Sequence, residues 1–152
     1  MKKVLMMHGP SHNMFGHRDK NLYGTVTYEE INRKMEETAK ELGLELEIFQ
    51  SNHEGDFIDK VQEAFFQKVD AVIANPGGWT NSSIAVKDAL DILTCPRVEV
   101  HMSNVFKKHN GTAQAETAKP ATGVIIGFGA EAYCLALQAV AAILTDYRRT
   151  NG

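Results

Sequence analysis

Residues 4–10 read Val-Leu-Met-Met-His-Gly-Pro, a continuous apolar run that ends in polar and chain-breaking residues. Such a run is typical of a strand covered on both faces, as in a parallel sheet. The pattern returns at residues 69–78, which end in Asn75-Pro76-Gly77-Gly78, and at residues 97–104, which end in His101-Met102-Ser103-Asn104. Loops that follow buried parallel strands meet at one edge of the sheet, so we expect these three segments to line one site.

The sequence predicts helices between the strands. Thr27-Tyr28-Glu29-Glu30 is a capping box, and one apolar face continues the helix to Leu42, before Gly43 ends it. Residues 57–65, a segment beginning at Ser82-Ser83 and residues 130–147 predict three further helices. Residues 44–48 alternate between apolar and acidic side chains, which indicates a half-exposed strand at the edge of the sheet.

Residues 124–126 complete the set of strands. Regular alternation of strands and helices requires a parallel sheet with right-handed crossovers. We therefore predict an α/β fold, a flavodoxin-like three-layer sandwich whose five-stranded parallel sheet has the order 2-1-3-4-5, in a single domain spanning residues 1–152. The final helix is apolar around much of its circumference, which fits either burial within one chain or contact with another subunit.

Composition narrows the functional classes. The chain has 16 Lys+Arg against 19 Asp+Glu, a net charge of -3, and no basic run, so nucleic acid is not an expected partner. Cys95 and Cys134 are too few for a secreted disulfide framework, and we expect both to be packed thiols. The first apolar run is too short for a signal peptide and no stretch could span a bilayer, so we expect a soluble cytoplasmic protein without a membrane partner.

The loops carry residue types suited to proton transfer. Arg18 and Tyr23 share a glycine-flanked loop, where a guanidinium near the phenol would favour the phenolate and make Tyr23 a base. His101 ends a strand two residues after Glu99, which could hydrogen-bond the imidazole and fix its tautomer. The backbone amides of Met102-Ser103 could hold a carboxylate. The structural alternatives are a loop tyrosine that covers apolar surface and a histidine buried at a strand end.

Two other patterns carry less information. His8, His12 and His17 crowd the first loop, but no carboxylate or thiol stands at ligand spacing, so we expect no metal site. Gly127-Phe128-Gly129 lacks the third glycine of the dinucleotide fingerprint and the Lys-Ser/Thr of a phosphate loop, so a tight turn is the better interpretation.

The order of the motifs resembles type II 3-dehydroquinate dehydratase, a family of small flavodoxin-like enzymes of the shikimate and quinate pathways. The likeness covers almost the whole chain. It is carried by Gly9-Pro10, Gly16 with Arg18, Tyr23-Gly24, residues 50–55, Asn75-Pro76-Gly77, Asp88-Ala89-Leu90, Val98-Glu99-Val100-His101 with Ser103-Asn104, and residues 123–130.

This resemblance implies a lyase that removes water from 3-dehydroquinate through an enolate, giving 3-dehydroshikimate without a metal or organic cofactor. It implies that Tyr23 removes the proton alpha to the ketone with Arg18 as its activator, and that His101 protonates the departing hydroxyl. Substrate binding would involve Asn75 and Met102-Ser103, which would hold the carboxylate.

The resemblance also implies a homo-oligomer, a trimer or a dodecamer, in which Asp88 is contributed across a subunit boundary.

Several positions depart from the family pattern. Ser11 stands where the family has asparagine, Asn81 where it has histidine, Thr112 near the place of an arginine, and Lys87 where it has arginine. In the family, that histidine and the arginine near Thr112 bind the hydroxyl edge of the substrate. We expect recognition of this edge to be weakened or changed.

Ser11 and Asn81 are retained as predicted substrate-binding positions, and Asn81, Lys107, Lys108 or His109 could replace the lost contacts. Two alternatives stay open: a related lyase or isomerase that enolises a different carboxylated keto substrate, and a non-catalytic paralogue that binds a metabolite.

Overall fold

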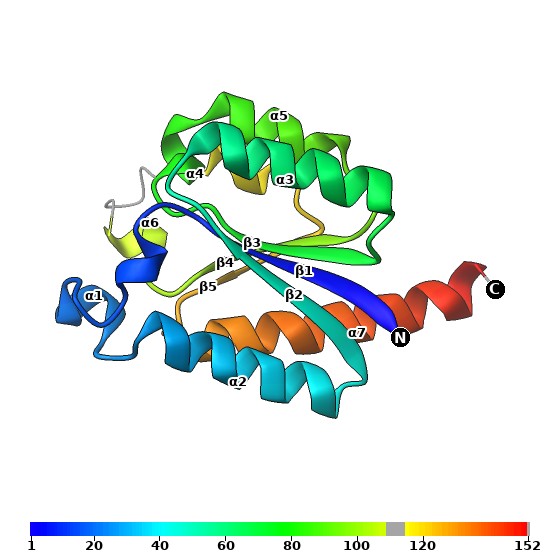
Figure 1. The fold of residues 1–152 in the computed structure, drawn as a ribbon, viewed down its shortest axis with the longest axis horizontal. Coiled ribbons are helices and arrows are strands. Elements are labelled where there is room, and N and C mark those ends of the chain that lie inside the picture. The colour runs from blue at the N-terminus through cyan, green and yellow to red at the C-terminus, as the bar shows by residue number, and fades with distance from the viewer. Residues whose placement is uncertain (109–114, 152) are drawn as a thin grey trace.

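A five-stranded parallel sheet divides two layers of helices in the computed structural model, which describes residues 1–108 and 115–151 (Figure 1). The strand order β2-β1-β3-β4-β5 confirms the predicted topology. The strands are β1 (Lys2–His8), β2 (Leu44–Gln50), β3 (Ala71–Asn75), β4 (Arg97–His101) and β5 (Gly123–Ile126).

The register aligns the carboxyl ends of the central strands. His8 at the end of β1 lies opposite Asn75 at the end of β3, and Ala74 lies opposite Glu99 of β4. The polar segments that follow these strands therefore leave the sheet from the same edge, as the sequence predicts.

Two pairs of long helices cover the sheet. Figure 1 shows α2 (Tyr28–Glu41) and α7 (Glu131–Asn151) on one face, and α3 (Glu54–Gln67) and α5 (Ile84–Ile92) on the other. Alternate residues of β1 supply the two cores, Val4 and Met6 toward α2 and α7, Leu5 and Met7 toward α3 and α5. β1 is thus buried on both faces, whereas β2 alternates as expected of an edge strand.

Two of the long helices begin with a side-chain cap, of which the cap at Thr27 was predicted from the sequence. The Thr27 hydroxyl accepts a hydrogen bond from Glu30 N at 3.1 Å. The Ser83 hydroxyl likewise accepts from Val86 N at 3.0 Å, because Ser83 has the extended backbone typical of a cap.

The loops contain short helices that the sequence analysis did not predict. They are η1 (His12–Met14), α1 (Lys20–Tyr23), α4 (Trp79–Ser82), α6 (Val105–Lys108) and η2 (Glu116–Ala118). None is long enough to show a helical period in its sequence. The helix predicted to begin at Ser82-Ser83 is α5, which starts at Ile84 with Ser83 as its cap, whereas Ser82 is the last residue of α4.

Most apolar residues of α7 are buried by contacts within this chain. Tyr133, Leu137 and Val140 are fully buried, whereas Leu135 is 37% exposed.

Cys95 and Cys134 are free thiols of intermediate burial. Across the described residues, no helix has the length and apolar character needed to cross a membrane.

Candidate active site

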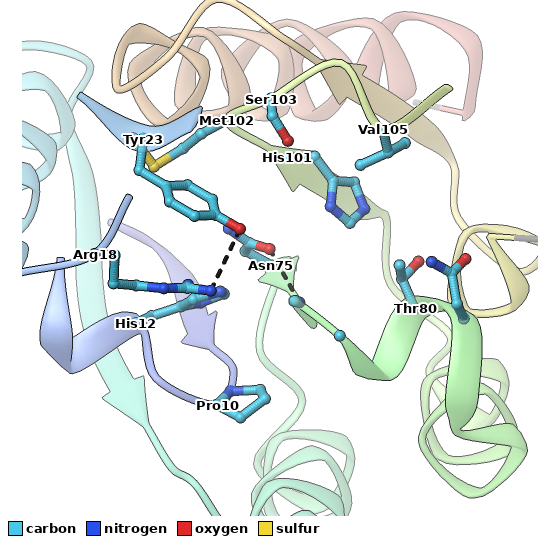
Figure 2. Close-up of a pocket in the computed structure, with 13 residues that line it drawn as sticks. Pro10, His12, Arg18, Tyr23, Asn75, Thr80, His101, Met102, Ser103 and Val105 are labelled. Carbon is cyan, nitrogen blue, oxygen red and sulfur yellow. Dashed lines mark hydrogen bonds between the residues drawn. The ribbon is translucent and has the colours of Figure 1, made fainter. Parts of the chain in front are cut away.

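A cavity of about 300 Å³ lies where the loops after β1, β3 and β4 meet (Figure 2). Its wall brings together the segments that the sequence analysis assigned to one site. The lining residues are Pro10, His12, Arg18, Tyr23, Asn75, Gly77, Gly78, Thr80, Asn81, His101, Met102, Ser103 and Val105.

Arg18 and Tyr23 form a pair on the loop after β1. The Asp19 carboxylate accepts from Asn21 N at 2.9 Å and so caps α1, whose last residue is Tyr23. Arg18 Nη2 donates to the Tyr23 hydroxyl at 3.3 Å, and Arg18 Cζ lies 4.2 Å from the centre of the Tyr23 ring. The buried Phe15 supports the ring from the side, at 5.5 Å between centroids. A positive charge therefore lies directly beside the phenol oxygen.

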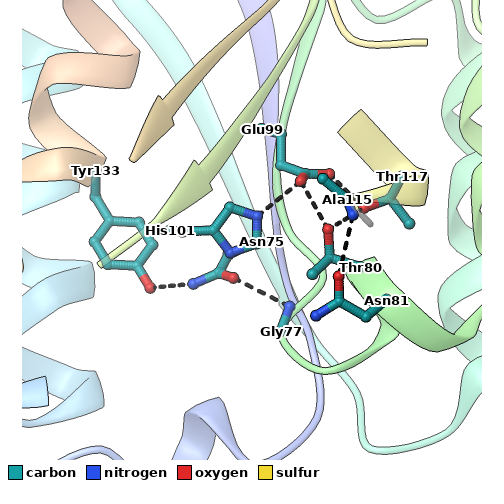
Figure 3. Close-up of polar contacts among 9 residues, drawn as sticks. All are labelled: Asn75, Gly77, Thr80, Asn81, Glu99, His101, Ala115, Thr117 and Tyr133. Atoms are coloured by element: carbon teal, nitrogen blue, oxygen red, sulfur yellow. Dashed lines mark hydrogen bonds and ion pairs between the residues drawn. The ribbon is translucent and has the colours of Figure 1, made fainter. Parts of the chain in front are cut away.

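His101 is held by a buried carboxylate. Its Nε2 lies 2.7 Å from Glu99 Oε2, and the hydroxyls of Thr80 and Thr117 donate to Glu99 at 3.0 Å and 2.5 Å (Figure 3). All four residues are almost inaccessible to water. Because Nε2 faces Glu99, Nδ1 is the imidazole nitrogen left for a ligand in the cavity. The predicted contact between Glu99 and His101 is confirmed.

Asn75 is fixed from both ends of its amide. Its Nδ2 donates to the Tyr133 hydroxyl at 2.8 Å, and its Oδ1 accepts from Gly77 N at 3.1 Å (Figure 3). Burial, above all, raises the pKa of Tyr133 well above its usual value, so this hydroxyl stays neutral. One Nδ2 hydrogen of Asn75 remains for a ligand.

The backbone turns into the cavity after β4. Met102 and Ser103 both line it, and among the described residues no acceptor contacts their backbone N–H groups. Adjacent free amides of this kind are suited to an anionic group such as a carboxylate.

The backbones after β1 and β3 are in direct contact. Gly9 N donates to Asn75 O at 2.8 Å, and a Cβ added at Gly9 would lie 2.7 Å from Pro76 O. A side chain at position 9 would therefore force these two walls of the cavity apart.

Asn81 lines the cavity at the end of α4. Its Oδ1 accepts a hydrogen bond from Ala115 N at 3.1 Å, which connects α4 to the segment before η2 (Figure 3). The Nδ2 hydrogens of this amide, and the second lone pair of Oδ1, are left for a ligand.

Other predicted residues lie outside the cavity. Ser11 is exposed in a left-handed conformation, and its N–H donates to Asn52 Oδ1 at 2.9 Å. Asp88 lies on α5 with its side chain 68% exposed, and Lys107 is exposed as well. The side chain of Lys108, and His109 and Thr112 altogether, lie outside the part that the structure describes.

His12 is a cavity residue whose position the sequence analysis missed, because it considered this histidine only as a metal ligand. It stacks on Phe15, and its Nδ1 accepts from Gly9 N at 3.0 Å. Burial, reinforced by the nearby His8, Arg18 and His101, holds the pKa of His12 well below its usual value. Its place two residues after Gly9-Pro10, on a loop that leaves a buried strand, was the available sequence signal.

No group of three His, Cys, Asp or Glu side chains is placed to hold a metal ion in residues 1–108 and 115–151. Of the first-loop histidines, His8 Nε2 instead contacts Asn32 Oδ1 at 2.9 Å, and His17 is exposed.

Comparisons with known proteins agree on one family. Residues 2–141 match the family model described as dehydroquinase class II. The chain is 46% identical over 144 residues to a 3-dehydroquinate dehydratase of Caldicellulosiruptor bescii, covering 95% of this chain and 99% of that protein.

Solved structures give the same result. A type II dehydroquinase from Butyrivibrio crossotus superposes with a TM-score of 0.88 at 38% identity, covering 91% of this chain and 97% of the other. A 3-dehydroquinate dehydratase-like protein from Bifidobacterium longum has a TM-score of 0.70 at 31% identity, covering 95% and 99%.

Proposed function

Because this chain belongs to the dehydroquinase class II family, we propose that it dehydrates 3-dehydroquinate to 3-dehydroshikimate, with Tyr23 as base and His101 as acid. One observation carries the assignment of roles. The Arg18–Tyr23 pair and the Glu99–His101 pair, from loops far apart in the sequence, line the same cavity.

The first step is removal of a proton from the carbon next to the ketone. Tyr23 accepts this proton as the phenolate, and the Arg18 guanidinium beside its oxygen stabilises that charged form. The electron pair of the broken C–H bond moves into the ring and forms an enolate.

The second step is loss of the hydroxyl from the neighbouring carbon, which also carries the carboxylate. His101 gives its Nδ1 proton to this hydroxyl, which leaves as water while the enolate collapses to the conjugated enone. Glu99 holds Nε2 of the same ring, so the imidazole is oriented and its positive charge is compensated before it gives up the proton.

The carboxylate is bound by the N–H groups of Met102 and Ser103, with the remaining Asn75 Nδ2 hydrogen as a third donor. Asn81 contacts the hydroxyl edge through Nδ2. Because the Asn81 amide is neutral, it binds this edge less strongly than a charged side chain would.

We also propose a cytoplasmic homo-oligomer, a trimer or a dodecamer, with Asp88 near a neighbouring subunit. Ile84, one turn before Asp88 on α5, is 64% exposed and is an apolar side chain that such a contact would cover. Light scattering after gel filtration gives the mass, and a monomer at micromolar concentration would contradict this part.

The activity is tested by following the ultraviolet absorbance of the enone product formed from 3-dehydroquinate. Turnover by the wild type and its loss in Tyr23→Phe are expected, with Tyr28→Phe as the matched control because Tyr28 does not line the cavity. A folded wild type that exchanges deuterium into cyclic keto acids without dehydrating 3-dehydroquinate would instead indicate the related enolising enzyme.

A further inference from the structure

His12 has no role in the steps described above, yet it is a buried polar side chain on the cavity wall. The ring is fixed on three sides. It stacks on Phe15 at 4.9 Å between centroids, meets the edge of His8 at 6.2 Å, and lies so close to Gly77 that an added Cβ there would be 2.8 Å from Nε2. This ring cannot turn without displacing its neighbours.

The hydrogen bond at Nδ1 fixes the tautomer. Gly9 N–H is shared between Asn75 O at 2.8 Å and His12 Nδ1 at 3.0 Å. A hydrogen on Nδ1 would point at this N–H, so Nδ1 is the acceptor and Nε2 carries the hydrogen. Within the described part of the chain, the side-chain hydrogen bond of His12 is the one at Nδ1, and none is formed by Nε2.

The neighbourhood also keeps the ring uncharged. Burial is the main cause of the low pKa of His12, and the Arg18 guanidinium and the imidazoles of His8 and His101 disfavour a further positive charge. His12 therefore presents a neutral N–H donor at neutral pH.

The chemistry of the substrate tells which of its atoms lies near His12. In the ring, the carbon that loses the proton lies between the carbon bearing the carboxylate and the ketone carbon. With the carboxylate at Met102 and Ser103 and the proton facing Tyr23, the ketone points to the opposite end. Figure 2 shows Met102 and Ser103 on one side of the Tyr23 hydroxyl and His12 on the other.

We propose that His12 donates a hydrogen bond from Nε2–H to the ketone oxygen and stabilises the negative charge that develops there in the enolate. The inference rests on the proposed function and adds to it a neutral electrophile. A fixed donor aimed at the developing oxyanion needs no reorganisation during the reaction, which is where such groups contribute most.

Three variants test this role by steady-state kinetics with 3-dehydroquinate. His12→Leu removes the donor, His12→Gln keeps an N–H donor, and His17→Leu is the control on the same loop because His17 is exposed. We expect His12→Leu to lower kcat by about 100- to 1000-fold with a much smaller change in KM, and His12→Gln to recover part of the loss. A kcat within twofold of wild type in His12→Leu would overturn the inference.

A second measurement uses the wild type alone, so its result does not depend on whether a variant folds. In protein carrying ¹⁵N-histidine, binding of the product 3-dehydroshikimate, which retains the ketone, should move the His12 Nε2–H signal downfield and leave His17 unchanged. An unmoved His12 signal at saturating product contradicts the inference. Failure of the proposed function is seen separately, as a wild type that does not dehydrate 3-dehydroquinate.

Discussion

Glu99 Oε2 lies 2.7 Å from His101 Nε2, and the two residues are only 2% and 6% exposed. A carboxylate in this position does more than hold the ring in place, because between two buried side chains it would also offset the positive charge of a protonated imidazole. The acid that we propose for the reaction is therefore a pair of residues, and we expect its performance to depend on both.

Replacement of Glu99 by glutamine should lower kcat by about 10- to 100-fold, the range expected when a hydrogen bond to a charged group is lost. The side chain keeps its size, so the fold and KM should change little. Steady-state kinetics measure the effect, with Glu116→Gln as control because Glu116 lies on η2 away from the cavity. An unchanged kcat in Glu99→Gln would show that His101 needs no charged partner.

Arg18→Gln should lower kcat by about 100-fold, because the phenolate that we propose at Tyr23 would lose the cation beside its oxygen. A matched control is Arg33→Gln, which removes an exposed arginine of α2 paired with Glu37. Solvent-deuterium exchange into the substrate at the carbon next to the ketone should fall in parallel with kcat. Exchange at the wild-type rate would mean that Arg18 acts after proton removal.

Acid should destabilise the protein through His8. Burial lowers the pKa of His8 from 6.5 to about 4, and Nδ1 of this ring is buried with no hydrogen-bond partner among residues 1–108 and 115–151. The unfolded chain therefore binds more protons than the folded one between these two values, and stability falls as the pH drops from 6.5 toward 4. The shift corresponds to about 3 kcal/mol in the free energy of unfolding.

Urea unfolding at pH 7.5, 6 and 4.5 measures this dependence. Carboxylates also bind protons over part of this range and so change the free energy of unfolding as well. The comparison is therefore between wild type, His8→Gln and the exposed control His17→Gln. A pH dependence that is equally steep in His8→Gln and wild type would assign the effect to other groups.

Tyr133→Phe should destabilise the protein by about 1–3 kcal/mol, because the buried Asn75 Nδ2 loses its acceptor. The freed amide can also turn away from the substrate carboxylate, so KM should rise. Chemical denaturation and kinetics measure the two effects, and Tyr28→Phe is the control on α2. Unchanged stability and KM would show that Gly77 alone is enough to hold Asn75.

The sequence predicted the sheet and most of the cavity because both depend on local patterns. Apolar runs that end in His8, Asn75 and His101 show where three strands stop, and parallel topology then brings those ends together. The Thr27 cap is equally local, since donor and acceptor are three residues apart. Sequence spacing is sufficient evidence for features of this kind.

The missed features depend on contacts between distant segments. Thr117 reaches Glu99 from 18 residues away, and Tyr133 reaches Asn75 from 58 residues away. His12 takes its orientation from a backbone amide and from the close approach of Gly77. Nothing in the order of residues indicates these partners, because only the folded chain brings them together.

The contact between Gly9 and Pro76 limits how this pocket can be redesigned or diversify in evolution. Because not even a methyl group fits between Gly9 and Pro76, the loops after β1 and β3 keep a constant separation. The part of a ligand that lies between these two loops is constrained in the same way. New substrate preference should then arise by substitution at Asn81 and Val105, whose side chains line the same cavity but do not hold the loops after β1 and β3 together. Libraries that leave Gly9 untouched and randomise those two codons should yield more folded variants than libraries that include it.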